Sequence, residues 1–91
     1  MKHKRYVVYY SGQVQGVGFR YAVCRLSNRF DVEGFIRNLP DGRVQLIAEG
    51  NTDQLDPFLQ SIQDEMADYI IAKQLDRQEP TGEFSDFGLR W

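Results

Sequence analysis

One stretch of the sequence, residues 11–20, combines residue types that suit the binding of an anion. It contains Gly12, Gly16 and Gly18 and ends in Arg20. Glycine lets a backbone turn tightly and approach a ligand with no Cβ in the way. An arginine guanidinium offers a planar fork of N–H donors that matches phosphate oxygens. These residue types at this spacing fit a phosphate-binding loop, and they fit equally well a tight turn that ends in a solvated arginine.

The flanking sequence predicts a strand before this loop and a helix after it. Tyr6–Tyr10 is a run of β-branched and aromatic residues, which is typical of a strand. After the loop, apolar residues recur at steps of three and four, the pattern of one helix face: Phe19, Ala22, Val23, Leu26 and Phe30. The first N–H groups of a helix have no partner within it and carry the positive end of its dipole. A loop that leads into a helix N-terminus therefore favours an anion site.

Three other phosphate-binding patterns fail at single positions. A dinucleotide-binding G-x-G-x-x-G motif that starts at Gly16 would need a small residue where Tyr21 stands. A P-loop would need a lysine directly after a glycine, and no glycine of this chain has one. A cysteine phosphatase would need an arginine six residues after Cys24, where the chain has Phe30. The loop therefore belongs to none of these classes.

Length and composition indicate one globular domain that spans residues 1–91. Hydrophobic residues make up 42% of the chain, which suits a folded core. The net charge is −2, but residues 1–50 hold eight Lys or Arg and four Asp or Glu, whereas residues 51–91 hold three and nine. This distribution argues against a nucleic-acid-binding surface over the whole molecule and favours a small, local anion site. We expect the basic run Lys2–Arg5 to be a solvated terminus.

The single cysteine, Cys24, excludes an internal disulfide. No apolar stretch is long enough for a signal peptide or a membrane span, so we expect a cytoplasmic protein without a membrane partner. No base stands near Cys24 in the sequence, and the only histidine is His3. Cys and His residues do not occur at metal-ligand spacing. The sequence therefore predicts neither a cysteine nucleophile nor a metal site, and it requires no cofactor.

The rest of the chain predicts further strands and a second helix. The turn Leu39–Gly42 separates two strands of a hairpin, since proline, aspartate and glycine each favour a turn position. Apolar residues at helical spacing predict a helix that follows a cap at either Thr52 or Asp56 and ends near Met66. The strands expected after the first helix cover residues 31–39, 43–49, 69–76 and 84–91.

The resulting order, β-α-β-β-α-β followed by a terminal strand, predicts an α+β fold. This order is that of the ferredoxin-like βαββαβ sandwich, in which an antiparallel sheet carries two helices on one face. Right-handed crossovers would place the first and third strands side by side in the centre. Asn38 then stands at the end of a strand, directly before the hairpin turn. Its amide can hold and aim a water molecule, although asparagine is also common there for structural reasons.

Two stretches, Gly12–Arg20 and Gly34–Gly42, strongly resemble the motifs of the acylphosphatase family. With the length, the element order and the aromatic C-terminus, the resemblance covers nearly the whole chain. It implies metal-independent hydrolysis of the carboxyl–phosphate bond of acyl phosphates. It also implies a guanidinium clamp at Arg20 and a water-positioning amide at Asn38. The residues that it implies for binding the phosphate are Gln15, Gly16, Val17, Gly18, Phe19 and Arg20.

The expected partner is a small acyl phosphate, with inorganic phosphate or sulfate as a ligand of the site and a monomeric enzyme. Two other functions fit the same fold. RNA recognition uses aromatic residues on an open sheet face, and residues 33–36 loosely follow that pattern, although their first and last positions break it. A catalytically silent anion-binding module would keep the loop for structural reasons. We expect Arg37 to be solvated, and we expect the aromatic residues Tyr9, Tyr10 and Phe35 to be packing or sheet-face residues rather than to stack on a substrate.

Overall fold

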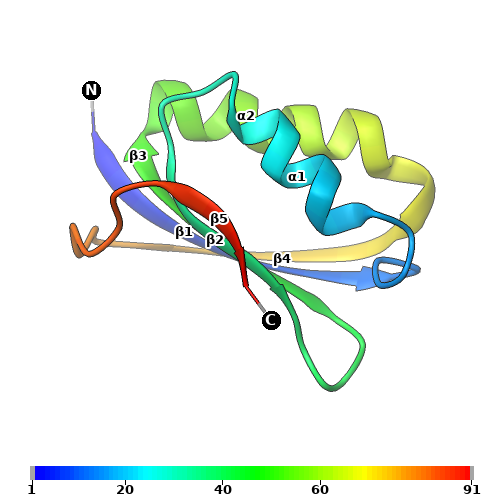
Figure 1. Cartoon of the computed structure of the whole chain (residues 1–91). Coiled ribbons are helices and arrows are strands. Elements are labelled where there is room, and N and C mark those ends of the chain that lie inside the picture. Colours follow the sequence, from blue (N-terminus) through cyan, green and yellow to red (C-terminus); the bar gives the residue numbers. More distant parts are fainter. Residues whose placement is uncertain (1, 91) are drawn as a thin grey trace.

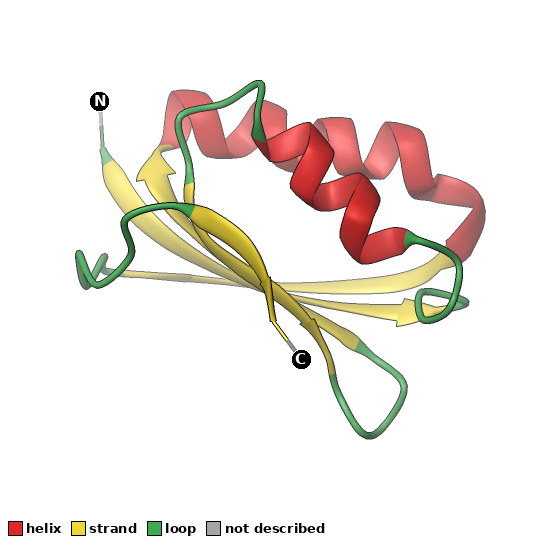
Figure 2. Ribbon diagram, in the orientation of Figure 1, coloured by secondary structure: helices red, strands yellow, loops and turns green. Residues whose placement is uncertain are grey.

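A computed structural model describes residues 2–90 of the chain (Figure 1). A five-stranded sheet forms one layer, and both α-helices lie along one of its faces (Figure 2). In chain order the elements are β1 His3–Gly12, α1 Phe19–Ser27, β2 Glu33–Asn38, β3 Val44–Asn51, α2 Thr52–Met66, the 3₁₀ turn η1 Ala67–Tyr69, β4 Ile70–Gln78 and β5 Phe87–Arg90. The predicted ferredoxin-like βαββαβ order is confirmed. Within residues 2–90, no helix is long and apolar enough to span a membrane.

The strands lie in the order β4-β1-β3-β2-β5, so the first and third strands are neighbours, as predicted. Strand β1 pairs antiparallel with β3 and β4, and β2 pairs antiparallel with β3. Residues 79–86 carry the chain from the β4 edge to the β2 edge (Figure 1). There β5 pairs parallel with β2, with Phe87 opposite Gly34 and Arg90 opposite Arg37. The complete sheet is therefore mixed, with an antiparallel core and one parallel edge strand.

The main core lies between the sheet and the helices. Successive strand side chains point to opposite faces, so alternate residues of β1 face this core, and Tyr6, Val8 and Tyr10 are at most 2% exposed. Burying a side chain of this size stabilises the fold by about 1.5–3 kcal/mol relative to exposing it. Phe19 and Val23 of α1 are equally buried, which fixes the start of that helix over the sheet. The α2 face that packs here consists of Leu55, Phe58, Leu59, Ile62 and Met66.

Helix α1 is shorter than the sequence predicts. It ends at Ser27 rather than Phe30, because the chain after it tightens into hydrogen bonds between residues three apart. Phe30 still packs against the core, with its ring centroid 5.8 Å from that of Phe58. The apolar periodicity therefore predicted the burial of Phe30 correctly but not its secondary structure.

Helix α2 begins at Thr52, earlier than either predicted cap allows. Its N-cap is Asn51, the last residue of β3, so the predictions of a cap at Thr52 or Asp56 were both wrong. The strand runs directly into the helix, and the Thr52 N–H donates to the carbonyl of Lys2 at 2.9 Å. Pro57 consequently lies inside the helix instead of in its first turn.

The terminal strand is also shorter than predicted. β5 covers Phe87–Arg90, whereas the expected strand covered residues 84–91. Phe84 lies in the preceding loop, and Trp91 lies outside the described residues. Phe87 faces the core, where its ring centroid is 5.5 Å from that of Phe58.

The sheet face away from the helices carries a second, smaller apolar cluster. Its buried members are Val7, Phe35 and Ile47, and Tyr9 and Phe84 pack beside them. The expectation that Phe35 packs within the fold is confirmed, since only 7% of it is exposed.

Arginine side chains extend over this cluster. The guanidinium carbon of Arg90 lies 4.1 Å from the ring centroid of Phe35, and that of Arg37 lies 5.8 Å from the same ring. The prediction of a solvated Arg37 was wrong. Its Nε donates a hydrogen bond to Oε1 of Gln45 at 2.7 Å, because the β2–β3 register places the two residues opposite each other.

The expectation of a solvated basic terminus is confirmed for Lys2 and His3, which are exposed, but not for Arg5, which lies within β1. The side chain of Arg5 is only 15% exposed. Its Nη1 lies 3.1 Å from a carboxylate oxygen of Glu49 and 2.7 Å from one of Glu83. The ion pairs of Arg5 thus link β1 to β3 and to the loop after β4.

Glu49 is the buried centre of this network, with 3% of the residue exposed. Its carboxylate accepts hydrogen bonds from the N–H groups of Thr81 and Gly82 as well as from Arg5. Burial alone would raise the pKa of Glu49, but these donors bring the pKa below its ordinary value.

We expect Glu49→Gln to lower the free energy of unfolding at pH 7 by about 1–3 kcal/mol, the usual effect of losing charged, buried hydrogen bonds. Because the pKa of Glu49 is lower in the folded than in the unfolded chain, its contribution is present at neutral pH and lost as the pH falls. Urea unfolding between pH 7 and about pH 3 checks this. Wild type should lose stability more steeply than Glu49→Gln. Equal slopes would contradict the prediction, and Glu79→Gln, at a carboxylate 82% exposed, should behave like wild type.

Candidate active site

Helix α1 follows directly on the glycine-rich loop. Its N-cap, Gly18, has a left-handed backbone with φ 76° and ψ 18°. Gly16 has φ 77°, in the same region, which favours glycine because a Cβ would crowd the backbone. The first helical hydrogen bond runs from the N–H of Ala22 to the carbonyl of Gly18, at 3.0 Å. The two glycines therefore turn the chain sharply into the helix.

The amide groups of this loop are available to a ligand. Among residues 2–90, none accepts a hydrogen bond from the N–H groups of residues 15–19, and no side chain caps α1. Such N–H groups carry the positive end of the helix dipole and together form an anion-binding site.

A pocket of about 150 Å³ lies at this helix N-terminus. Its lining residues come from the loop, the first turn of α1 and the end of β2: Val14, Gly16, Gly18, Phe19, Arg20, Tyr21 and Asn38. The structure therefore brings Arg20 and Asn38, the two predicted catalytic residues, to one pocket with part of the predicted phosphate loop. Gln15 and Val17 of that loop lie outside the lining.

Arg20 lies in the first turn of α1 at the rim of this pocket. Its Nη1 donates a hydrogen bond to the backbone carbonyl of Arg90, at 3.1 Å. Arg90 ends β5, which pairs with the strand that leads to Asn38. The terminal strand therefore helps to orient the guanidinium. Sequence reasoning missed this contact because the residues are 70 positions apart and a backbone acceptor leaves no sequence signal.

Asn38 ends β2, opposite Val44 of β3. Its side-chain oxygen, Oδ1, is buried and accepts no hydrogen bond from the described residues. Leaving a buried acceptor without a partner costs about 1–3 kcal/mol, so such atoms are rare in folded proteins. Because Asn38 lines the pocket, this oxygen can accept a hydrogen bond from a water molecule or ligand held there.

Gln15 ties the loop to the hairpin that carries Asn38. Its Nε2 donates hydrogen bonds to the carbonyl oxygens of Leu39, at 2.8 Å, and Arg43, at 2.9 Å. These two residues frame the hairpin turn, where the Leu39 N–H also bonds to the Arg43 carbonyl at 2.8 Å. The side-chain amide of Gln15 is thus engaged, so any contact of this residue with a phosphate would come from its backbone N–H.

Replacing Gln15 by alanine should lower the kcat for acyl phosphate hydrolysis by about tenfold or more, because small displacements of reacting groups are costly. The loss of two hydrogen bonds should also reduce the free energy of unfolding by about 1–2 kcal/mol. Steady-state kinetics and urea unfolding measure the two effects. Gln13→Ala is the matched control, since the Gln13 side chain is exposed in the same loop and makes neither bond. If Gln15→Ala had the same kcat as Gln13→Ala, the hydrogen bonds from Gln15 to the hairpin would have no part in catalysis.

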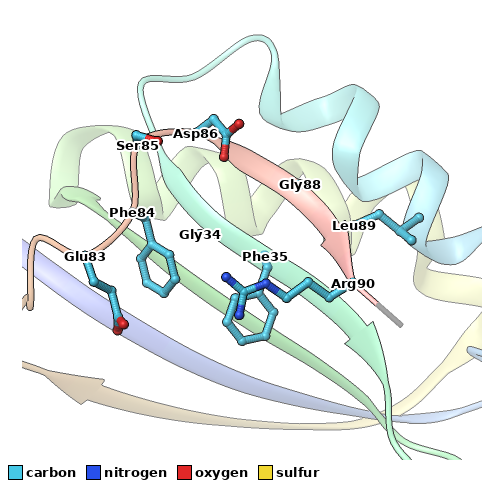
Figure 3. Close-up of a pocket in the computed structure, with 9 residues that line it drawn as sticks. All are labelled: Gly34, Phe35, Glu83, Phe84, Ser85, Asp86, Gly88, Leu89 and Arg90. Atoms are coloured by element: carbon cyan, nitrogen blue, oxygen red, sulfur yellow. The ribbon is translucent and has the colours of Figure 1, made fainter.

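A larger pocket, of about 280 Å³, lies on the open sheet face between β2 and residues 83–90 (Figure 3). Figure 3 shows the rings of Phe35 and Phe84 side by side, with the guanidinium of Arg90 over Phe35. None of the predicted site residues lines it. Size favours this pocket, but only the smaller one combines a helix N-terminus, a rim guanidinium and an unpartnered amide oxygen. The smaller pocket is therefore the candidate active site.

Cys24 lies one helical turn beyond Arg20 on α1 and is partly buried. Burial raises the pKa of its thiol, and the nearby charge of Arg20 offsets only part of that increase. The thiol therefore stays protonated at neutral pH, as expected of a bystander. Within residues 2–90, no group of three or more His, Cys, Asp or Glu side chains is placed to hold a metal ion.

Comparisons with known proteins place this geometry in context. The family model described as acylphosphatase matches residues 6–89. The chain is 43% identical over 76 residues to an acylphosphatase of Methanospirillum hungatei JF-1, which covers 84% of each chain. It is 40% identical over 88 residues to an acylphosphatase of Syntrophus aciditrophicus, covering 94% of this chain and 91% of the other. The crystal structure of acylphosphatase from Bacillus subtilis is similar over 97% of this chain and 99% of that one, with a TM-score of 0.87 and 25% identity.

Proposed function

Because the chain belongs to the acylphosphatase family and hydrolyses acyl phosphates, we propose that the pocket at the N-terminus of α1 performs this reaction. Gln15, Gly16, Val17, Gly18 and Phe19 hold the phosphoryl group with backbone N–H groups. Arg20 clamps it with its guanidinium, and Asn38 positions the attacking water. No metal ion takes part in this scheme.

One observation carries the proposal: Asn38, whose buried Oδ1 has no hydrogen-bond partner within residues 2–90, lines the same small pocket as Gly18 and Arg20 at the N-terminus of α1. The N–H groups and Arg20 provide positive charge for the phosphoryl oxygens. The Asn38 oxygen provides an acceptor for a water O–H. A phosphoryl-transfer site needs both, and their positions follow from the packing of α1 and β2.

The reaction needs little further catalytic assistance from the protein. An acyl phosphate releases a carboxylate, whose conjugate acid has a low pKa, so the leaving group needs no general acid. Negative charge spreads over the equatorial phosphoryl oxygens in the transition state. Preorganised N–H donors that face this charge are worth about 10²–10³ each in rate. Positioning and charge stabilisation are therefore sufficient for this activated bond.

Water bound to Asn38 attacks phosphorus as the bond between phosphorus and the acyl oxygen breaks. The electron pair of that bond leaves with the carboxylate. An amide has no usable pKa, so Asn38 cannot remove the proton of the water. The proton passes instead to a phosphate oxygen of the substrate, which gives a carboxylate and inorganic phosphate as products.

We further propose a cytoplasmic, monomeric enzyme formed by one domain over residues 1–91. The single cysteine suits a reducing compartment. Inorganic phosphate and sulfate, like the phosphoryl group, present negatively charged oxygens around a tetrahedral centre. Both should therefore compete with the substrate for the loop.

Release of phosphate from acetyl phosphate in excess EDTA tests the proposal. Turnover that EDTA leaves unchanged, with competitive inhibition by inorganic phosphate, would support it. Phosphate binding without turnover would support a silent anion-binding module. RNA binding with a steep salt dependence would support the RNA hypothesis. The open face argues against RNA, because the guanidinium of Arg43 lies 4.7 Å from the ring centroid of Tyr9, over a surface that base stacking would need.

A further inference from the structure

The pocket at the α1 N-terminus is too small to enclose an acyl phosphate that has a bulky acyl group. Its volume is about 150 Å³. Sites that enclose a whole drug-sized ligand measure about 300–1,000 Å³. If the phosphoryl group fills the loop, as proposed above, a bulky acyl group must extend beyond the pocket. The residues at the rim then decide which acyl groups the enzyme prefers.

The rim carries an unusually exposed aromatic residue. Tyr21 lines the pocket, yet 69% of it is exposed. Helical side chains tilt toward the helix N-terminus, so Tyr21, in the first turn of α1, leans toward the mouth of the loop. Val17, 39% exposed, belongs to the same loop. Only two other large hydrophobic residues are similarly exposed within residues 2–90, namely Tyr69 and Ile71.

The orientation of the reaction brings the acyl group to this rim. The attacking and leaving oxygens lie roughly in line through phosphorus. With the water on the Asn38 oxygen, inside the pocket, the leaving acyl oxygen points outward. A planar acyl group that emerges there meets apolar surface, because the flanking loop residues Gly16 and Gly18 have no side chains to interpose.

We propose that Tyr21, with Val17, forms an apolar lip that contacts the acyl group of the substrate. The enzyme then prefers acyl phosphates with a planar, apolar acyl group over those with a short aliphatic one. An aromatic contact of this kind adds a factor of about three to ten in kcat/KM. This inference rests on the proposed function of the pocket and concerns only its specificity.

The test compares benzoyl phosphate with acetyl phosphate in wild type, Tyr21→Ala and Tyr21→Phe. We expect Tyr21→Ala to lower kcat/KM for benzoyl phosphate about three- to tenfold and that for acetyl phosphate less than twofold. Tyr21→Phe keeps the ring and should keep the wild-type ratio. The inhibition constant of inorganic phosphate should stay unchanged in all three, because phosphate occupies only the loop. Ile71→Ala is the control, since Ile71 is an exposed apolar side chain, 83% exposed on β4, that does not line the pocket.

An unchanged ratio of the two kcat/KM values in Tyr21→Ala would overturn the inference. If kcat/KM fell equally for both substrates and inorganic phosphate also inhibited more weakly, the ratio would again be unchanged, and Tyr21 would only support the loop. Both results leave the proposed function intact. A wild-type protein that hydrolyses neither substrate would instead overturn the proposed function and this inference with it.

Discussion

Replacing Arg20 by alanine is expected to lower kcat/KM for acetyl phosphate by about 10³–10⁵-fold, the contribution of an arginine to a transferring phosphoryl group. Arg20 lines the pocket at the α1 N-terminus from the first turn of that helix, and its Nη1 donates a hydrogen bond to the Arg90 carbonyl at 3.1 Å. Both binding and catalysis should suffer, because the phosphoryl group is negative before and during the reaction. Phosphate release and inhibition by inorganic phosphate measure the two effects separately.

Lysine at the same position separates charge from geometry. Arg20→Lys keeps the positive charge but loses the planar fork, so it should recover part of the phosphate affinity and little of the rate. Arg29→Ala is the matched control, since Arg29 is an exposed arginine just beyond the end of α1. If kcat/KM of Arg20→Ala for acetyl phosphate lay within tenfold of that of Arg29→Ala, Arg20 would not be the residue that clamps the phosphoryl group.

The element order could be predicted because it depends on local patterns. Alternation in Tyr6–Tyr10 and helical spacing from Phe19 to Leu26 each arise from neighbours in the chain. The hairpin turn is likewise local: Gly42 has φ 95°, and the Arg43 N–H donates to Asp41 Oδ1 at 3.0 Å. The element ends were less predictable. They depend on pairing with distant segments, as where Asn51 ends β3 and caps α2 at once.

Contacts between distant segments could not be predicted from the same patterns. Arg5 looked like part of a solvated basic run, yet it pairs with Glu49, 44 positions away. The tether from Gln15 to Leu39 spans 24 positions and ends on a backbone carbonyl. A backbone acceptor places no requirement on residue type, so the sequence shows only one partner of such a contact.

Local sequence patterns predicted individual features of the site but not that they meet in one pocket. Glycines before a helix indicated an anion site by local physics. The joining of Arg20 and Asn38 came from resemblance to a family, since spacing alone does not place the end of β2 beside α1. The structure adds that Asn38 Oδ1 is buried and has no hydrogen-bond partner in the described part of the chain, which depends on every atom around it.

Asn38→Ala is expected to lower kcat by about 10²–10³-fold, because an attacking water that is no longer aimed loses most of its advantage. KM and the inhibition constant of inorganic phosphate should change little, since in the proposed scheme the loop and Arg20 hold the phosphoryl group. This separation from the Arg20 variants is the kinetic signature of a residue that positions the nucleophile. A loss of phosphate affinity equal to the loss in kcat would contradict it and assign Asn38 to phosphate binding.

The stability of the same variant provides an independent check. Among residues 2–90, no hydrogen bond joins the Asn38 side chain to another residue, and its Oδ1 is left to a water molecule or ligand. Asn38→Ala should therefore leave the free energy of unfolding within about 1 kcal/mol of that of wild type. If Asn38 were only a strand-end residue that satisfies the turn, its loss would destabilise the fold and leave kcat nearly unchanged. Urea unfolding and steady-state kinetics on one preparation therefore distinguish the two roles, because each role predicts the opposite pair of results.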